Sequence, residues 1–276
     1  EALRALDRLV QKDGSPTDWA RILEKLLQVV EGTEEALGVV LKLGNLYGEL
    51  KDERAMLRTA GRAANLFPND DQAFELGERT LKTYARYRDL CDLYERRFQQ
   101  LEGDANAAEK MAGLLERKGG VELEKLNAVA EAAKSFTRVL ELRPGDGATM
   151  SRLESILSNV GDWQRLVAVY ERHANSLKDV REQIGYLHRA ARIAHQRLRD
   201  EAETVRLYER IHLLDPSDSE SFAALEKRLE RQNDYKRLIT LLPERSTMVS
   251  SSDEVLECLL RAAGICEKIA DVPQAI

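Results

Sequence analysis

The sequence lacks the patterns that mark membrane spans and β-sheets. No apolar run approaches the roughly 18 residues that cross a bilayer. Alternating apolar and polar stretches rich in β-branched residues are missing, so we expect no sheet. Aromatic residues make up only 5% of the chain, and its 3 cysteines leave at least one thiol unpaired. An unpaired cysteine suits a reducing compartment, so the cytoplasm is slightly favoured and the periplasm stays open.

A strong imbalance of charge is also missing. The 276 residues include 42 Lys and Arg and 48 Asp and Glu, which gives a formal net charge of −6. Nucleic-acid binding usually needs a basic face or stripe, and the chain has no block of about five or six like charges. We therefore expect no nucleic-acid partner.

The signatures of common active sites are missing as well. The chain has 4 histidines but neither the His-Glu-x-x-His nor the Cys-x-x-Cys spacing of a metal site. Gly-x-Ser-x-Gly and the phosphate-binding loop do not occur either. We therefore predict no enzyme activity, no cofactor, no metal site and no small-molecule ligand within these residues.

What the chain does have is a repeated motif, Leu-x-Pro-x-Asp. A proline ends the helix before it, because it lacks an N–H and clashes with the preceding turn. The aspartate two residues later can cap the next helix. The prolines are 76 and 72 residues apart, which indicates one structural unit stacked repeatedly. The three copies are Leu66–Asp70, Leu142–Asp146 and Leu214–Asp218.

A second series of aspartates divides this period in two. Asp precedes an aromatic residue at three predicted helix starts, and Asp89-Leu90 is a weaker fourth member of this series. A further series of aspartates begins the alternate helices. The merged spacing is 34–38 residues, the length of a two-helix repeat. Two unlike helix pairs therefore alternate. The aspartates are Asp18, Asp162 and Asp234 before aromatic residues, and Asp52, Asp200 and Asp271 in the other series.

These signals predict an all-α chain, a single solenoid over residues 1–276 with about seven to eight helix pairs. Ala, Leu, Glu, Arg and Lys dominate the composition, as in helical proteins. One irregular unit is expected around 119–142, where Gly119-Gly120 breaks the rhythm and a long helix over 121–142 follows. The expected pairs are 1–12 with 18–31, 33–50 with 52–66, 70–85 with 87–101, 104–118 with 121–142, 147–160 with 162–177, 179–198 with 200–214, 217–232 with 234–245, and 251–270 with 272 onward.

Both ends of the sequence lie within the repeat pattern. Glu1–Val10 resembles the middle of a repeat, and residues 273–276 read as the first turn of a new helix. Neither end carries the polar capping helix that a terminal repeat needs. We therefore expect an internal stretch of a longer array.

Residues 37–70 resemble a tetratricopeptide repeat. The family places a Leu-Gly pair, a tyrosine, small residues in the second helix and a final proline at fixed spacing. Residues 184–216 keep part of the pattern, and the alternate units, with Asp-Trp and Tyr-Glu-Arg, resemble degenerate or half-tetratricopeptide repeats. The matching residues in 37–70 are Leu43-Gly44, Tyr47, Ala60, Ala63 and Pro68.

This resemblance implies a right-handed superhelix that works as a protein-binding scaffold. First helices would line a concave face that holds proteins or peptides, and second helices a convex one. Gly44 would let the second helix of its pair approach closely. One subgroup of the family grips a C-terminal carboxylate with Lys and Asn on its first helices. Asn45 stands at that Asn position, but Leu41 replaces the Lys, so only Asn45 remains as a candidate contact.

One cluster of side chains could bind a partner. His188, Arg192 and His195 are spaced i, i+4 and i+7 on the predicted helix 179–198, so they share a face. Such a stripe could hold a carboxylate or phosphate through charge-assisted hydrogen bonds. The alternative is an ordinary solvated helix face. The repeated Trp19, Trp163 and Tyr-Glu-Arg positions are interpreted as packing between units, because a binding site would be expected once.

Two function classes remain open. The first is a non-enzymatic scaffold for protein–protein interaction within a multi-protein assembly. The second is a regulatory or substrate-recognition module of a larger enzyme or signalling protein whose catalytic part lies outside this stretch. RNA-associated scaffolding is suggested only by the half-repeat resemblance and disfavoured by the acidic balance. The Arg, Ala and Leu usage suggests a GC-rich bacterial source.

Overall fold

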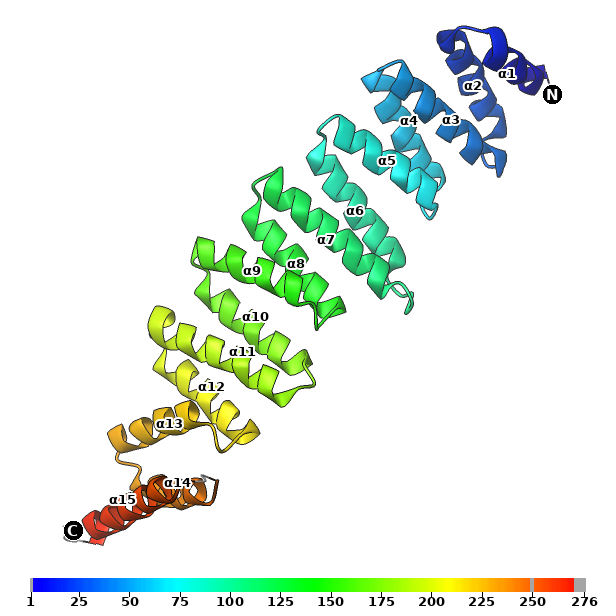
Figure 1. Ribbon diagram of the computed structural model, residues 1–276. Helices are drawn as coiled ribbons and strands as arrows, with labels where there is room; N and C mark the ends of the chain where they lie inside the picture. Colours follow the sequence, from blue (N-terminus) through cyan, green and yellow to red (C-terminus); the bar gives the residue numbers. More distant parts are fainter. Residues whose placement is uncertain (1, 249–250, 271–276) are drawn as a thin grey trace, which may run out of the picture. The chain divides into compact units, whose positions relative to one another are not determined.

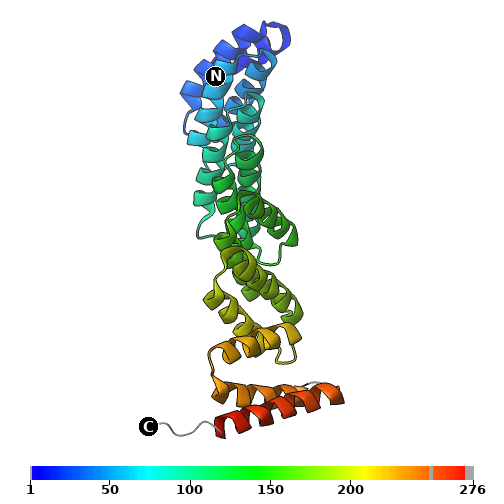
Figure 2. The ribbon, with the colours of Figure 1, turned by 90° about the vertical axis from the view of Figure 1, so that its left-hand side faces the viewer.

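The computed structural model describes residues 2–248 and 251–270, and within them all regular structure is helical. Consecutive helices run antiparallel and stack in pairs (Figures 1 and 2). They form two compact units, Glu1–Arg143 and Pro144–Ile276, each a stack of such pairs. The all-α solenoid prediction is confirmed. The helices are α1 Ala2–Asp13, α2 Pro16–Val30, α3 Glu35–Glu49, α4 Glu53–Leu66, α5 Asp71–Thr83, α6 Tyr87–Leu101, α7 Ala108–Glu124, α8 Val129–Leu142, α9 Gly147–Val160, α10 Trp163–Ser176, α11 Val180–Ile193, the π-helical segment η1 Ala194–Leu198, α12 Glu201–Leu214, α13 Ser219–Arg231, α14 Tyr235–Met248 and α15 Ser252–Ala270.

The Leu-x-Pro-x-Asp motif acts as the predicted stop and start signal. In all three copies a helix ends at the leucine, and the aspartate carboxylate accepts a hydrogen bond from a backbone N–H of the next helix. Asp70 accepts from Ala73 N at 2.9 Å, Asp146 from Ala148 N at 3.0 Å, and Asp218 from Ser221 N at 2.7 Å. Each cap contributes about 1 kcal/mol.

The other aspartate series is only partly as predicted. Asp52, Asp162 and Asp200 cap their helices. Asp18 and Asp89 instead lie in the first turns of α2 and α6, whose N-cap residues are Ser15 and Arg86. At α2, the Ser15 hydroxyl donates to Asp18 at 2.6 Å and accepts from the Asp18 backbone N–H at 3.2 Å.

The predictions placed on Asp234 and Asp271 differ in outcome. Asp234 accepts from the backbone N–H of Arg237 in the first turn of α14 at 3.3 Å, as a cap does. Asp271 lies outside the described residues, as does the helix expected from 272 onward.

The break predicted at Gly119-Gly120 is wrong. Helix α7 runs through both glycines, and the interruption falls at 125–128 instead. A Cβ on Gly119 would lie 3.1 Å from Cζ of Phe136, a ring that is 1% exposed. The glycine therefore makes room for the neighbouring helix rather than ending its own, and α8 begins at 129 with an N-cap residue, Ala128, that makes no side-chain cap.

Gly44 packs against a different helix from the one expected. A Cβ there would lie 2.6 Å from Cδ1 of Leu76, which belongs to α5, the first helix of the next pair. The second helix of its own pair, α4, instead faces Gly48 through Met56. Gly44 thus sets the approach between successive pairs, and Leu43 beside it is fully buried.

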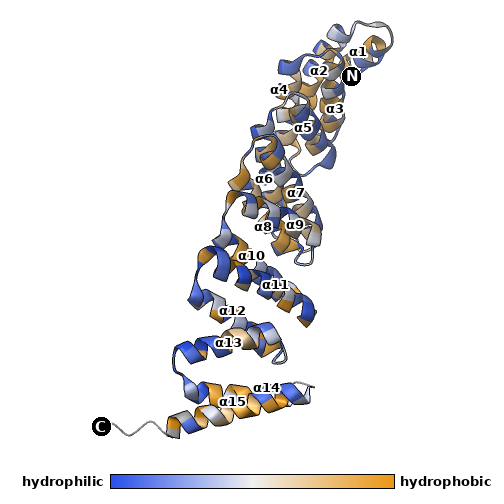
Figure 3. Ribbon diagram, turned by 60° about the vertical axis from the view of Figure 1, so that its left-hand side comes forward, coloured by the Kyte–Doolittle hydropathy of each residue, from blue (hydrophilic) through white to orange (hydrophobic). Residues whose placement is uncertain are grey.

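Apolar residues fill the seams between helices and charged residues bridge them on the outside. Where α14 and α15 pack side by side, both carry long apolar stretches (Figure 3). On the second helices, an acidic residue pairs with arginines on the second helix of the next pair, in a set we call the glutamate–arginine ladder. Its rungs are Glu24 (α2) with Arg58 and Arg62 (α4), Glu95 (α6) with Arg138 (α8), and Glu171 (α10) with Arg206 and Arg210 (α12).

A buried side chain binds the carbonyl oxygen of each motif proline, and we call this contact the proline latch. The donor stands 29 residues after the proline in every copy. Arg97 Nη1 donates to Pro68 O at 2.8 Å, and Arg245 Nη1 to Pro216 O at 3.4 Å. In the second copy, a ring nitrogen of His173 binds Pro144 O instead.

The two arginine latches also share an aromatic support. The Arg97 guanidinium lies 5.9 Å from the ring of Phe74, and that of Arg245 lies 5.1 Å from Phe222. Each phenylalanine follows its proline by six residues. In the second copy that position is Met150, and His173 instead contacts the edge of Tyr186, with 4.5 Å between ring centroids.

Candidate interaction surfaces

His188 and Arg192 lie together on α11, as predicted, but they face acidic groups of the chain itself. His188 Nε2 is 3.0 Å from Oδ2 of Asp218, the N-cap residue of α13, and its Nδ1 is 3.7 Å from Oε2 of Glu220. The His188 side chain is only 14% exposed. It therefore ties α11 to the start of the next pair.

The Arg192 guanidinium holds Glu220 with two hydrogen bonds, the shorter at 2.7 Å. These bonds lower the pKa of the Glu220 carboxyl. Tyr208 donates its hydroxyl to the same carboxylate at 3.0 Å, and its burial, with the charge of Glu220, raises the Tyr208 pKa to about 12. Arg192 remains 59% exposed, so part of its guanidinium still faces solvent.

His195 is not brought into this cluster. It lies in the π-helical segment η1, where the wider turn changes the i, i+4, i+7 relation on which the predicted stripe depended. Its side chain is exposed and has no hydrogen-bond partner in the described part of the chain. The structure thus groups two of the three predicted residues.

Asn45 lies in a groove between two successive first helices, α3 and α5. The groove has a volume of about 630 Å³ and includes Leu41, Glu75, Arg79 and Lys82 among its lining residues. Asn45 Oδ1 accepts from Arg79 Nη2 at 2.7 Å, so its oxygen is already used inside the chain. Its amide NH2 is the part left to meet a partner.

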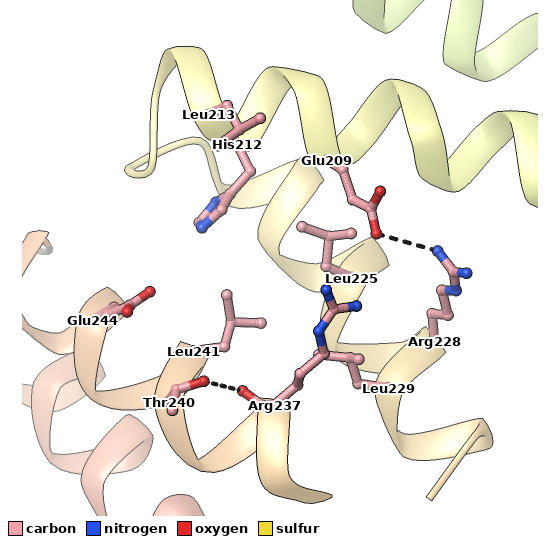
Figure 4. A pocket seen from close by; sticks show the side chains of 10 residues that line it. All are labelled: Glu209, His212, Leu213, Leu225, Arg228, Leu229, Arg237, Thr240, Leu241 and Glu244. Carbon is pink, nitrogen blue, oxygen red and sulfur yellow. Dashed lines mark hydrogen bonds and ion pairs between the residues drawn. The ribbon is translucent and has the colours of Figure 1, made fainter. Parts of the chain in front are cut away.

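A second groove, which we name the α12–α14 groove, was not predicted. It has a volume of about 340 Å³ and lies among α12, α13 and α14, with the side chains of Figure 4 around it. Leu225 and Leu229 are buried at its floor, whereas Leu213 is 82% exposed. Glu209 and Arg228 form an ion pair of 3.4 Å at its margin.

The sequence did contain a signal for this groove. The residue directly before the leucine of the Leu-x-Pro-x-Asp motif is Asn65 in the first copy, Glu141 in the second and Leu213 in the third. A polar surface position has therefore become apolar in one repeat only. A large exposed apolar side chain beside a groove is the type of feature that marks an interaction site.

The aromatic residues interpreted as packing have partners within the chain. Trp19 Nε1 donates to Oδ1 of Asp7 at 2.7 Å, and the guanidinium of Arg197 lies 4.9 Å from the ring of Trp163. Tyr94, 1% exposed, donates to Oε1 of Glu78 at 2.6 Å. These contacts link neighbouring helices.

The described residues offer neither a metal centre nor a membrane-spanning helix. Among the described residues, no group of three or more His, Cys, Asp or Glu side chains could hold a metal ion. No helix of the described part is both long and apolar enough to cross a membrane.

Comparison with known proteins supports the tetratricopeptide resemblance. A sequence model of the family described as "Tetratricopeptide repeat" matches residues 149–184. These residues contain α9, α10 and the start of α11. The match falls on one of the alternate units, which we had expected to resemble the family less than 37–70 does. No curated protein sequence matches the chain significantly.

Solved structures with similar helical architecture include a tetratricopeptide repeat protein from Parabacteroides merdae, with 11% identity, 95% of this chain and 98% of that chain covered, and a TM-score of 0.37. Yeast Tom70 has 14% identity, 94% and 60% coverage, and a TM-score of 0.33. The P58(IPK) tetratricopeptide domain has 11% identity, 96% and 78% coverage, and a TM-score of 0.34. With TM-scores this low, these superpositions add nothing to what the helices themselves show.

Proposed function

We propose that this tetratricopeptide-like repeat chain is a non-enzymatic scaffold that binds other proteins or peptides through grooves between its helices. Helical repeats of this kind stack into extended surfaces, which suit the binding of other proteins. Its buried tyrosines with raised pKa values, such as Tyr94 and Tyr208, are bonded to glutamates that join helices, which is a structural use.

The observation that carries the proposal is the exposure of Leu213 at the α12–α14 groove. Many charged side chains around it are used in pairing between helices, as the glutamate–arginine ladder shows. An 82% exposed leucine over a floor of buried leucines gains nothing from the chain itself. Covering such apolar surface by a partner contributes about 25 cal/mol per Å². The groove around Asn45 is the second candidate contact, on the first helices where the resemblance places the concave face.

Site-specific photo-crosslinking tests the proposal. A benzophenone amino acid at Leu213, and in a second variant at Asn45, should give a discrete covalent adduct with another protein in the cells that produce the chain. The same amino acid at Gln164, exposed on α10, serves as the control. The captured protein, once purified, should bind the unmodified chain with a measurable Kd. Adducts at none of the positions, or equal adducts at Gln164, would argue against a scaffold that uses these grooves.

A further inference from the structure

The glutamate–arginine ladder is interrupted at the α12–α14 groove. Glu171 of α10 pairs with Arg210 of α12 at 3.4 Å, and Arg210 stands ten residues after Asp200, the N-cap residue of its helix. For Glu209, the next Tyr-Glu-Arg glutamate, the equivalent residue on α14 is Glu244, ten residues after the capping Asp234. Two acidic residues thus stand where the preceding pair of second helices has an acid and a base.

Both glutamates line the groove, and neither bridges it. Glu209 turns to Arg228 on α13, at 3.4 Å. The Glu244 carboxylate has no cationic partner in the described part of the chain, and the residue is exposed. Among the described residues, no ion pair between α12 and α14 therefore crosses the groove.

The face of α14 that borders the groove has an ordered pattern of its own. Arg237, Thr240, Leu241 and Glu244 follow an i, i+3, i+4, i+7 spacing, so they share one side of the helix. The Arg237 guanidinium, like the Glu244 carboxylate, has no oppositely charged partner among the described residues. These two groups stand two turns apart, about 10 Å along the axis. Figure 4 shows them on opposite sides of Leu241, with His212 pointing in from α12.

We propose that the α12–α14 groove binds an amphipathic α-helix of a partner protein, and this proposal rests on the scaffold function proposed above. The helix places leucine-like side chains against Leu213 and Leu241. An acidic residue of this helix pairs with Arg237. A basic residue seven positions away, on the same face, pairs with Glu244. A second helix is the matching occupant because it repeats at the same pitch as α14, so both charges and the apolar centre meet their complements together.

Synthetic peptides can test this recognition with the full chain. Each probe is a capped, fluorescein-labelled helical peptide of about 18 residues with two central leucines, long enough to form a helix. One carries Glu and Arg seven positions apart on the leucine face, and the other carries Arg at both positions. Fluorescence anisotropy should show wild type binding the Glu/Arg peptide about fivefold more tightly, because one exposed ion pair replaces one repulsion.

Charge variants of the chain sharpen the test. Arg237→Glu should invert the preference towards the Arg/Arg peptide. Lys236→Glu makes the same charge change on an exposed position of α14 outside the groove lining, and should leave the preference as in wild type. Leu213→Asp should weaken binding of both peptides at least tenfold. Circular dichroism of each variant checks that the helices are retained.

Four outcomes would overturn the proposal: equal affinity of wild type for both peptides, no binding of either peptide, an unchanged preference in Arg237→Glu, or no loss of binding in Leu213→Asp. If crosslinking at Leu213 still captures a protein in any of these cases, the scaffold function stands and only the helical occupant is wrong.

Discussion

His173 hydrogen-bonds the carbonyl oxygen of Pro144 at the position where the other two proline latches have an arginine. An arginine keeps its charge at any ordinary pH, but a histidine can lose or gain a proton near neutrality. One of the three latches is therefore built from a group that titrates.

The proton balance of this latch makes stability depend on pH. Burial of His173, which is 4% exposed, lowers its pKa in the folded state. Below the ordinary histidine pKa the unfolded chain then binds more protons than the folded chain, so the free energy of unfolding falls as pH drops through that value towards the folded pKa.

We expect His173→Gln to reduce this dependence, because glutamine can donate the latch hydrogen bond and does not titrate. Urea unfolding at several pH values between about 7.5 and 5, followed by Trp163 fluorescence in a Trp19→Phe background, would measure the effect. The wild type should lose more stability than the variant over this range. Parallel losses in the two proteins would show that His173 is not the responsible group.

Gly44 should tolerate a methyl group poorly. In Gly44→Ala the new Cβ meets Leu76, which is 3% exposed and held in the core. Overpacking of this kind costs about 1–3 kcal/mol. Gly61, in α4, has nothing within 4 Å of the added Cβ, so Gly61→Ala should instead stabilise by about 0.5–1 kcal/mol. Denaturant unfolding of both variants tests the contrast, and equal effects would contradict it.

The Tyr94 hydroxyl should contribute measurably to stability. It donates to Glu78 from a nearly fully buried position. Burial acts to raise the pKa of the Glu78 carboxyl, but hydrogen bonds from Lys82 and Tyr94 hold this pKa below its usual range. We expect Tyr94→Phe to lower the free energy of unfolding by about 1.5–3 kcal/mol.

Tyr84 provides the matched control for this measurement. Within the described part of the chain, its hydroxyl contacts only the sulfur of Met56, at 3.9 Å. Tyr84→Phe should therefore change stability by less than about 0.5 kcal/mol. If Tyr94→Phe and Tyr84→Phe changed the free energy of unfolding equally, the Tyr94–Glu78 hydrogen bond would not be a specific contributor to stability.

Trp163 is half-buried under the guanidinium of Arg197 and does not lie in the deepest core. Trp163→Ala should then cost about 2 kcal/mol, less than the 3–5 kcal/mol of a fully buried tryptophan. Arg197→Ala should account for up to about 1 kcal/mol of this. Thermal unfolding of both single variants and the double variant measures the coupling, and strict additivity would exclude a direct interaction.

The order of the helices could be predicted because their limits depend on local chemistry. A proline ends a helix within its own turn. An aspartate begins the next helix by accepting a hydrogen bond from an N–H about three residues later. Gly119 was misread because its role depends on Phe136, a ring from another helix. A glycine in a helical pattern does not reveal whether it ends the helix or admits a neighbour.

The candidate site could be predicted only in part, since it depends on contacts between repeats. The spacing of His188 and Arg192 correctly placed them on one face of the helix. The carboxylates that they contact, Asp218 and Glu220, belong to the next helix pair. Prediction of the α12–α14 groove would have required an alignment of the three motif copies and attention to the position where Leu213 differs from the other two. Residues that recur in every repeat indicate how the helices are arranged, and residues that differ in one repeat indicate candidate contacts with a partner.

The proline latch has a consequence for how such an array can grow. Its acceptor and donor stand 29 residues apart, but successive latches are separated by two helix pairs. Excision of residues 145–216 would join Pro144 to Ser217 and leave Arg245 in the donor position. Removal of α9 and α10 alone would instead delete the His173 donor and leave the Pro144 carbonyl before α11. A block of four helices that runs from one motif proline to the next is therefore a module that can be copied or deleted with every proline still facing a donor.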